Sequence, residues 1–265
     1  MAGHGLIDRY MNVPALVKLE SGKAFVFSCA SPVKFTGNED CGAIYPGLNG
    51  DCLLVVADGI GGYANGARAS MHVTTALEKS ISIAAPIAER LEHISDSLQK
   101  ANKEIILRNT GEGSTVAIVH LDSNQIHTCH AGDSDILLIS SDGTIKYKTL
   151  AHSPVAEAQE MGLLDEHAAI HHQGRNFISN YLGDHEMFLA MSEGIDYEKS
   201  DTLLLASDGL FDNLYQDEIV EIALKESLAD AASQLADLAR ERMKGLDPAQ
   251  PSKPDDLTFI IYRAE

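Results

Sequence analysis

The chain has 265 residues, 45% of them hydrophobic, which is enough apolar material for one large globular domain with a real core. Its 39 acidic and 20 basic residues give a formal net charge of −19, so neither nucleic acid nor an anionic membrane is expected as a partner. The sequence lacks an apolar run of membrane-spanning length, and its four cysteines are scattered. Residues 1–11 carry no apolar stretch, so a secretory signal is not expected. We therefore expect a cytoplasmic protein with reduced cysteines.

The first part of the chain predicts strands followed by two helices. Apolar segments at 24–29 and 51–57 are typical of strands. Helical spacing of apolar residues then predicts one helix over 65–83 and a second from Pro86 to about residue 108.

The period of the pattern changes after residue 113. Short strand-like segments follow one another, with turn signals such as Asp142-Gly143 between them, at 114–121, 125–131, 135–140 and 144–149. A polar, His-rich insert at 152–184 carries two short helical patches, and an insert of this length is usually functional or mobile. The remainder predicts a strand, two helices and a last strand, at 202–206, 216–227, 229–244 and 257–262. The run of strands excludes a regular βαβ alternation and favours an α+β fold with helices covering antiparallel sheets.

Three aspartates stand where an apolar strand meets a turn. Asp58 and Asp208 each end a strand and precede a glycine, and Asp255 comes just before the last strand. Carboxylates buried together at one sheet edge repel each other, and a hard divalent cation, which prefers oxygen ligands, relieves the repulsion. The sequence therefore indicates metal-dependent chemistry.

Several ordered motifs support this interpretation, and they run through nearly the whole chain, from about residue 23 to 263. They are Asn38-Glu39-Asp40, Val56-Ala57-Asp58-Gly59-Ile60-Gly61-Gly62, Gly113-Ser114-Thr115, Ala131-Gly132-Asp133-Ser134, Ser207-Asp208-Gly209 and Asp255-Asp256-Leu257-Thr258. In their order and spacing they resemble the metal-dependent protein serine/threonine phosphatases, the PPM or type-2C family, in its bacterial form. The resemblance implies two packed antiparallel β-sheets flanked by helices, in a single phosphatase-like domain over 1–265 with a flap-like insert at about 152–184.

The resemblance also implies the roles of individual residues. Asp58 bridges two metal ions, Gly59 offers its backbone carbonyl to one of them, and Asp208 and Asp255 complete the set. Asp40 holds metal-bound water, with Glu39 behind it, so that Asp40 and Asp58 are the catalytic pair. Asp133, with Asp208, holds a third and weaker metal ion. The ions implied are Mg²⁺ or Mn²⁺, two per domain, about 3.5–4 Å apart, which lower the pKa of a shared water so that it attacks phosphorus.

One departure from the family pattern affects substrate binding. Family members usually carry an arginine that grips the substrate phosphate five residues before the Asp of Asn-Glu-Asp, and here that position is Phe35. Lys34, Arg68 and Arg175 are the candidates to replace it. A lysine neutralises phosphate as a point charge but lacks the bidentate fork of arginine.

Other residues have simpler interpretations beside the functional ones. Asp58 and Asp208, each taken alone, are typical turn carboxylates. Asp212 is a candidate ligand, but capping of the following helix is the favoured role, and Gly113-Ser114-Thr115 is favoured as a tight strand start over a phosphate loop. For the histidines of the insert, local hydrogen bonding is favoured over metal binding; these are His152, His167, His171 and His172.

The sequence thus supports hydrolysis of phosphoserine or phosphothreonine in a phosphorylated protein substrate. The alternative is a catalytically weak, phosphatase-like regulatory module that binds a phosphoprotein, and Phe35 is the feature that favours it. A phosphohydrolase acting on small molecules with the same metal site is the third hypothesis. The sequence specifies neither the substrate protein nor a cognate kinase.

Overall fold

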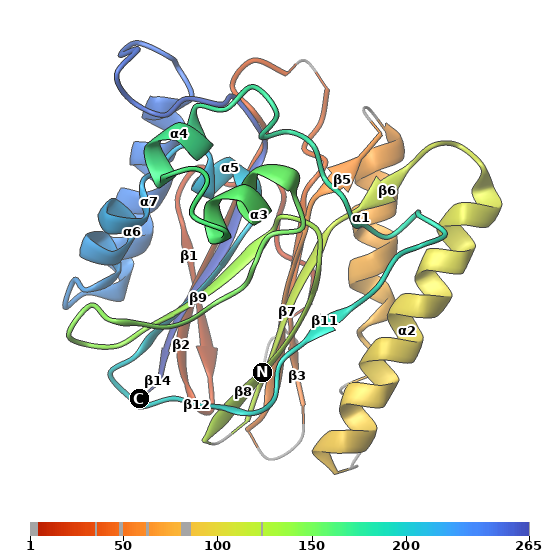
Figure 1. The fold of residues 1–265 in the computed structure, drawn as a ribbon. Helices are drawn as coiled ribbons and strands as arrows, with labels where there is room; N and C mark the ends of the chain where they lie inside the picture. The colour runs from red at the N-terminus through yellow and green to blue at the C-terminus, as the bar shows by residue number, and fades with distance from the viewer. Residues whose placement is uncertain are drawn as a thin grey trace.

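The computed structural model describes residues 5–34, 36–47, 50–61, 64–80, 86–122 and 124–264, and the statements below concern those residues. Over these ranges the strands form two six-stranded sheets and one two-stranded sheet. The two large sheets lie face to face, with helices against both outer faces (Figure 1). The predicted α+β fold of two packed antiparallel sheets is confirmed.

Hydrogen-bonded neighbours define the order of the strands in each sheet. The first sheet contains, in this order, β1 (Ala15–Leu19), β2 (Gly22–Cys29), β14 (Leu257–Ala264), β13 (Thr202–Ala206), β9 (Asp135–Ile139) and β10 (Ile145–Lys148). The second contains β11 (Ala190–Met191), β8 (Gln125–Ala131), β7 (Val116–Leu121), β4 (Cys52–Ala57) and β3 (Cys41–Pro46), and β12 (Ile195–Asp196) also pairs with β8. The two-stranded sheet joins β5 (Gly59–Ile60) to β6 (Gly113–Ser114).

The helices fall into three groups. The second sheet is covered by α1 (Ala64–Ala76) and α2 (Ile87–Arg108), and the first by α5 (Asp208–Phe211), α6 (Gln216–Ala223) and α7 (Leu228–Arg242). Two short helices, α3 (Pro154–Glu160) and α4 (Glu166–Ile170), lie at the upper end of the view in Figure 1. Among the described residues no helix is both long enough and apolar enough to cross a membrane.

Strand β4 shows why the central strands read as unbroken apolar runs. Successive side chains of a strand point to opposite faces, and both faces of β4 are covered. Leu53 and Val55 pack against α1 and α2, whereas Leu54 and Val56 pack between the two sheets. All four are fully buried, so hydrophobicity is required at every position rather than at every second one.

Two predicted helix ends are wrong. The first helix ends at Ala76 rather than at residue 83, because the hydroxyls of Thr74 and Thr75 bond to carbonyls one turn earlier, which weakens a helix. Residues 81–85, where the prediction continued, lie outside the described residues. The helix predicted to reach Ser227 ends at Ala223, since Ser227 instead caps the next helix by accepting a hydrogen bond from the Asp230 N–H.

Candidate active site

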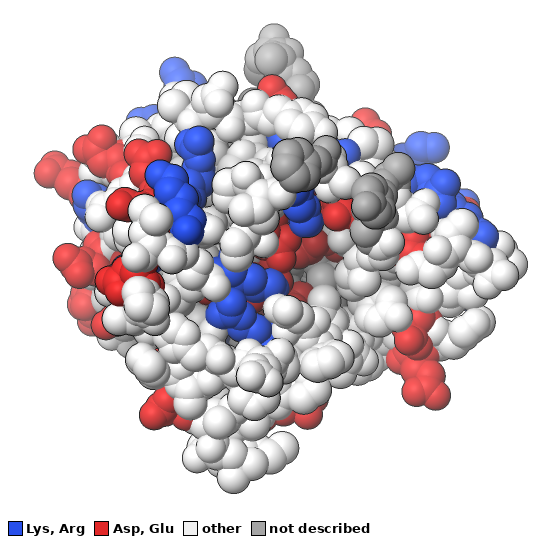
Figure 2. All heavy atoms as spheres, turned by 90° about the horizontal axis from the view of Figure 1, so that it is seen from above, with Lys and Arg blue, Asp and Glu red and all other residues white. Residues whose placement is uncertain are grey.

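Strand ends bring the predicted carboxylates to one end of the sandwich. Cys41 of β3 pairs with Ala57 of β4, so Asp40 and Asp58, the residues just beyond that pair, lie at the same sheet edge. Ala206 of β13 pairs with Asp135 of β9, and this register brings Asp208 to the turn that holds Asp133. Asp255 precedes β14, the partner of β13. Figure 2, which views the molecule from this end, shows acidic atoms within a hollow that Lys and Arg side chains flank.

Asp40 is completely buried and held by two polar neighbours. Its Oδ2 accepts a hydrogen bond from the Ser207 hydroxyl at 2.7 Å, and its backbone N–H donates to Asn38 Oδ1 at 2.9 Å. Ser207 lies directly before Asp208 in the sequence, so one hydrogen bond ties the β3 edge of one sheet to the β13 edge of the other. Asn38 therefore fixes the backbone at Asp40, and Ser207 fixes the direction of its carboxylate.

The Gly113-Ser114-Thr115 motif supports Asp58. The Asp58 N–H donates to Thr115 Oγ1 at 2.9 Å, and the Thr115 N–H donates to the Asp58 carbonyl at 2.9 Å. Thr115 Oγ1 also lies 2.7 Å from Ser134 Oγ, in the turn that carries Asp133. Gly113 and Ser114 form β6, which agrees with the predicted strand start.

Gly59 lies where the backbone has room for glycine alone. A Cβ at this position would come within 2.4 Å of the Gly66 backbone and 2.7 Å of the Glu39 carbonyl. Such contacts are far inside van der Waals distance, so two backbone segments approach each other through the absence of a side chain. This close approach seats the start of α1 against the Asp40 and Asp58 edge.

Burial and mutual repulsion shift the pKa values of the carboxyls. Burial first, and then the neighbouring Asp256, raises the pKa of Asp40 well above its usual range. Burial likewise raises the pKa of Asp58, with further contributions from four surrounding aspartates: Asp40, Asp208, Asp255 and Asp133. Burial and Asp208 raise the pKa of Asp133. The carboxyls of this end therefore hold their charge only when cations are supplied.

Two lysines supply part of that positive charge. Lys34 Nζ lies 3.3 Å from Glu39 Oε2, 3.2 Å from Asp255 Oδ1 and 3.0 Å from Asp256 Oδ2. Lys253 Nζ forms a close ion pair with Asp208 Oδ2 and lies 2.8 Å from Asp212 Oδ2 and 3.6 Å from Asp255 Oδ2. Burial opposes the charge of Asp208, but Lys253 outweighs it and lowers the pKa of that carboxyl.

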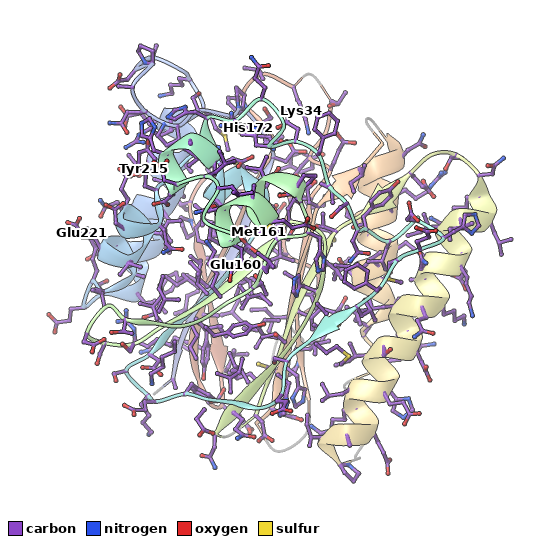
Figure 3. The ribbon with its side chains drawn as sticks, in the orientation of Figure 1. Lys34, Glu160, Met161, His172, Tyr215 and Glu221 are labelled. Atoms are coloured by element: carbon purple, nitrogen blue, oxygen red, sulfur yellow. The ribbon has the colours of Figure 1, made fainter. Side chains whose placement is uncertain are left out.

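The three candidates for phosphate binding are placed differently. Lys34 is at the carboxylates and lies at the upper end of the molecule in Figure 3. Arg68 pairs with the buried Glu112, with Nη2 at 2.6 Å from Oε2, and Arg175 donates to the carbonyls of Ile170 and Ser252. Phe35, the position of the departure from the family pattern, lies outside the described residues.

The chemistry of these side chains fits divalent metal ions. Within the described ranges no group of three or more His, Cys, Asp or Glu side chains is already arranged to hold a metal ion. Several buried carboxylate oxygens nevertheless have no hydrogen-bond partner there; these are Asp40 Oδ1, Asp133 Oδ1, Asp208 Oδ1 and Glu39 Oε1. Unpartnered, buried, anionic oxygens are what Mg²⁺ and Mn²⁺ bind. The predicted ligand set Asp40, Asp58, Gly59, Asp133, Asp208 and Asp255 stays a prediction.

A cavity of about 460 Å³ extends from the carboxylates toward the insert. Asp133, Asp208 and Asp212 line its inner part, and side chains of α3 and α4, such as Val155 and Ile170, line the opposite wall. Lys148 is the cationic residue on the β10 side. The insert at 152–184 therefore forms one wall of the space that leads to the predicted metal site.

The insert histidines make local contacts, as predicted. His152 Nδ1 accepts from the Gly132 N–H at 3.0 Å, and its ring stacks on His130 with centroids 4.5 Å apart. His172 Nδ1 accepts from the Gly174 N–H, and the His167 ring lies 4.8 Å from the His171 ring.

The predicted capping role of Asp212 is wrong. Helix α6 is capped at Tyr215, whose N–H donates to the Glu218 carboxylate at 3.0 Å. Asp212 instead lies at the end of α5, and its carboxylate meets Lys253. Burial raises the pKa of Asp212 to about 6, which places this carboxyl with the others of the site.

Lys253 is the residue of this site that no sequence motif indicates. It lies in a proline-rich loop, between Pro251 and Pro254, where a solvated side chain is the ordinary expectation. Its position two residues before Asp255 was the available signal. Because two residues span at most about 7 Å of chain, such a residue lies within reach of the same carboxylates.

The sequence is similar to those of known protein phosphatases. Residues 49–265 match the family model described as Stage II sporulation protein E (SpoIIE). A putative protein phosphatase 2C-type from Streptococcus pyogenes is 30% identical over 222 residues, which cover 81% of this chain and 89% of that protein. Serine/threonine phosphatase stp from Listeria monocytogenes is 29% identical over 205 residues, 74% of this chain and 81% of that protein.

Among solved structures, the serine/threonine phosphatase Stp1 from Staphylococcus aureus is similar in fold. The TM-score is 0.80 at 25% identity, and the match covers 98% of this chain and 99% of that one. The similarity extends over both sheets and their helices, so it concerns the complete arrangement that places the carboxylates together.

Proposed function

Since the chain belongs to the PPM, or type-2C, family of metal-dependent protein serine/threonine phosphatases, we propose that it hydrolyses phosphoserine or phosphothreonine in a protein substrate. Asp40, Asp58, Asp208, Asp255 and the Gly59 carbonyl would hold two Mg²⁺ or Mn²⁺ ions, and Asp133 would contribute to a third and weaker site. One observation carries the proposal: buried carboxylates from separate strand ends meet at one end of the sandwich with oxygens that lack hydrogen-bond partners.

When bound, such ions would supply Lewis acidity, which would lower the pKa of water and neutralise charge on the phosphoryl oxygens. The chain provides position and charge for that chemistry. Ser207 fixes Asp40 through its hydroxyl, and Thr115 fixes the backbone at Asp58. Lys34, which is 30% exposed, is the cation best placed to meet a phosphate that enters from solvent.

The space beside the metal site suits a protein substrate. The cavity of about 460 Å³ continues from Asp133 and Asp208 to the helices of the insert. We assign the chain to a single phosphatase-like domain over 1–265, in which residues 152–184 act as a flap that contributes to substrate choice. Exposed side chains of this segment, Met161, Leu163 and Phe177, offer apolar contacts to a peptide.

The alternative function is a catalytically weak module that binds a phosphoprotein. The observation in its favour is Phe35, which stands where the family pattern has a phosphate-binding arginine. The two functions differ in turnover, so one experiment separates them.

The test is hydrolysis of a phosphothreonine peptide and of a small aryl phosphate by metal-stripped protein, with and without added Mn²⁺. We expect hydrolysis of the peptide only with metal, and its near abolition in Asp208→Asn, which removes one charge shared among the metal positions. Full turnover in excess chelator would contradict the mechanism. Metal-dependent binding of the phosphopeptide without turnover would establish the alternative, and hydrolysis of the aryl phosphate alone would indicate a small-molecule phosphohydrolase.

A further inference from the structure

Lys253 holds an unusual position among the carboxylates of the site. Its ammonium contacts Asp208 closely, lies 2.8 Å from Asp212 Oδ2 and reaches Asp255 Oδ2 at 3.6 Å. Only 13% of the side chain is exposed. An ammonium buried among three carboxylates occupies a place that is otherwise suited to a metal cation.

The backbone of Lys253 is fixed from both sides. The Asn213 side chain, which is fully buried, accepts from the Lys253 N–H at 2.8 Å and donates to the Lys253 carbonyl at 2.9 Å. Arg175 donates to the preceding carbonyl, that of Ser252, at 2.8 Å. Pro254 restricts the backbone of Lys253, the residue before it. The loop therefore directs this side chain into the carboxylates, in contrast to a surface lysine that pairs by chance.

The ammonium competes directly with one predicted metal position. A third, weaker ion at Asp133 and Asp208 would need oxygens of Asp208, and Lys253 already contacts Oδ2 of that residue. Asp133 Oδ1 and Asp208 Oδ1 are buried without hydrogen-bond partners, so the remaining oxygens are free to bind a cation. A site with few protein ligands binds a divalent ion weakly, and a tethered monovalent cation is then a strong competitor.

We propose that Lys253 is a built-in cation that occupies the third metal position, the one predicted at Asp133 and Asp208, through its contacts with Asp208 and Asp212. The protein then binds two divalent ions tightly and a third only when the ammonium is displaced. The proposal rests on the proposed function, because it concerns the same carboxylates. It assigns the third position to a residue of the chain, whereas the family resemblance assigned it to a metal ion.

The experiment counts Mn²⁺ ions by calorimetry and by electron paramagnetic resonance on metal-stripped, full-length protein. Lys253→Met keeps the length of the side chain and removes its charge. Because a hydrogen bond to a charged group is worth about tenfold to a hundredfold in affinity, we expect the third Mn²⁺ to bind at least about tenfold more tightly in this variant. Lys253→Arg, which keeps the charge, should behave as the wild type.

Lys146→Met is the matched control. Lys146 Nζ lies 2.6 Å from the buried carboxylate of Asp201, just before β13, whereas Asp208 lies just after it. This variant also removes a lysine from a buried aspartate, but at the opposite end of the same strand. We expect its Mn²⁺ count and affinities to equal those of the wild type.

Thermal unfolding provides a second measurement that does not depend on activity. Without metal, Lys253→Met leaves carboxylates uncompensated, so its melting temperature should fall, and added Mn²⁺ should raise it by more than it raises that of the wild type. If Lys253→Met does not fold without metal, Lys253→Gln, which retains hydrogen bonding, is titrated in its place.

An unchanged third affinity in Lys253→Met would overturn the proposal, and so would loss of the two tight sites, since Lys253 would then organise the metals rather than compete with them. Both outcomes concern the variant, so neither would contradict metal-dependent phosphatase activity of the wild type. A wild-type protein that neither binds Mn²⁺ nor hydrolyses the peptide would instead refute the proposed function itself.

Discussion

An aspartate lies at each end of strand β4, and the two aspartates have different surroundings. Asp51, before the strand, forms a close ion pair with Arg90 and lies 3.4 Å from His120 Nε2. Asp58, after the strand, is surrounded by the charges of four other aspartates: Asp40, Asp133, Asp208 and Asp255. Both aspartates lie at the edge of the apolar core, but only Asp51 forms an ion pair with a single cation, Arg90.

The difference indicates which end serves stability and which serves function. A buried carboxylate with one guanidinium is balanced in charge, and this pair attaches α2 to the second sheet. The Asp58 end has many carboxylates and two lysines, Lys34 and Lys253, so negative charge remains in excess. Such an excess is costly in the absence of further cations, and divalent ions are the simplest source of them.

The largest expected effect on turnover comes from removing the negative charge of Asp58. Asp58→Asn should lower metal-dependent turnover of a phosphothreonine peptide by more than about a hundredfold, the upper range for loss of a supporting residue alone. Its melting temperature without metal should stay equal or rise, because one repelling charge is removed. Turnover close to that of the wild type would show that Asp58 is a turn carboxylate without a catalytic role.

The same change at the other end should affect stability instead. Asp51→Asn leaves the guanidinium of Arg90, whose side chain is 14% exposed, without its partner, and breaking a buried ion pair costs about 3–5 kcal/mol. Denaturant unfolding measures the loss, and turnover per folded molecule should remain that of the wild type. A large loss of turnover at unchanged stability would mean that the two ends are coupled in function.

Lowering the pH should change the contributions of the two ends to the free energy of unfolding in opposite directions. Burial, with Arg90 and His127, lowers the pKa of His120 to about 4, whereas the unfolded chain protonates this residue near 6.5. The unfolded state therefore binds more protons between about pH 6.5 and 4, and the contribution of His120 to stability falls as the pH falls through this window. At the site end, the pKa values of Asp40, Asp58 and Asp133 are raised in the folded state, so these carboxyls bind protons at higher pH than in the unfolded chain and oppose this loss.

The comparison of the wild type with His120→Gln isolates the first contribution. The free energy of unfolding should fall less steeply between pH 6.5 and 4 in the variant. Equal slopes in the two proteins would mean that His120 is protonated in the folded state in this range.

The smallest effect is expected at Lys34. The Lys34 side chain is 30% exposed, and a contact of such a partly exposed lysine with a phosphate is worth about 0–1 kcal/mol, or up to about fivefold in affinity. Lys34→Ala should raise KM for the peptide by that factor and leave the Mn²⁺ affinity nearly unchanged. Lys199→Ala, in an exposed loop, is the control, and an equal KM in the two variants would remove Lys34 from substrate binding.

The sequence predicted most of the fold because its central strands are covered on both faces. Segments such as 202–206 and 125–131 were correct at both ends, since the first is an apolar run and the second is bounded by turn signals at 122–124 and 132–134. Strand β1 was missed because most of its side chains are partly or fully exposed at a sheet edge, so it lacks the apolar run. Helix α5 was missed because four residues are too few for a helical period.

The candidate site was predicted where motif residues are adjacent to strand ends. Asp58, Asp208 and Asp255 were predicted by this rule, whereas Asp40 and Asp133 came from the family resemblance, and the structure brings all five to one end. Lys253 and the contact of Asp212 with it depend on how a loop returns over α5, which no local pattern encodes. Arg68 and Arg175 looked suited to phosphate by residue type, but a buried carboxylate and two carbonyls already use their donors.

The most direct test of the charge difference between the two ends of β4 is calorimetric titration of metal-stripped protein with Mn²⁺, in the wild type, Asp58→Asn and Asp51→Asn. We predict two tight sites in the wild type and in Asp51→Asn, and the loss of tight binding in Asp58→Asn. Equal binding by the wild type and Asp58→Asn, or loss of binding in Asp51→Asn alone, would contradict the assignment of metal chemistry to the Asp58 end.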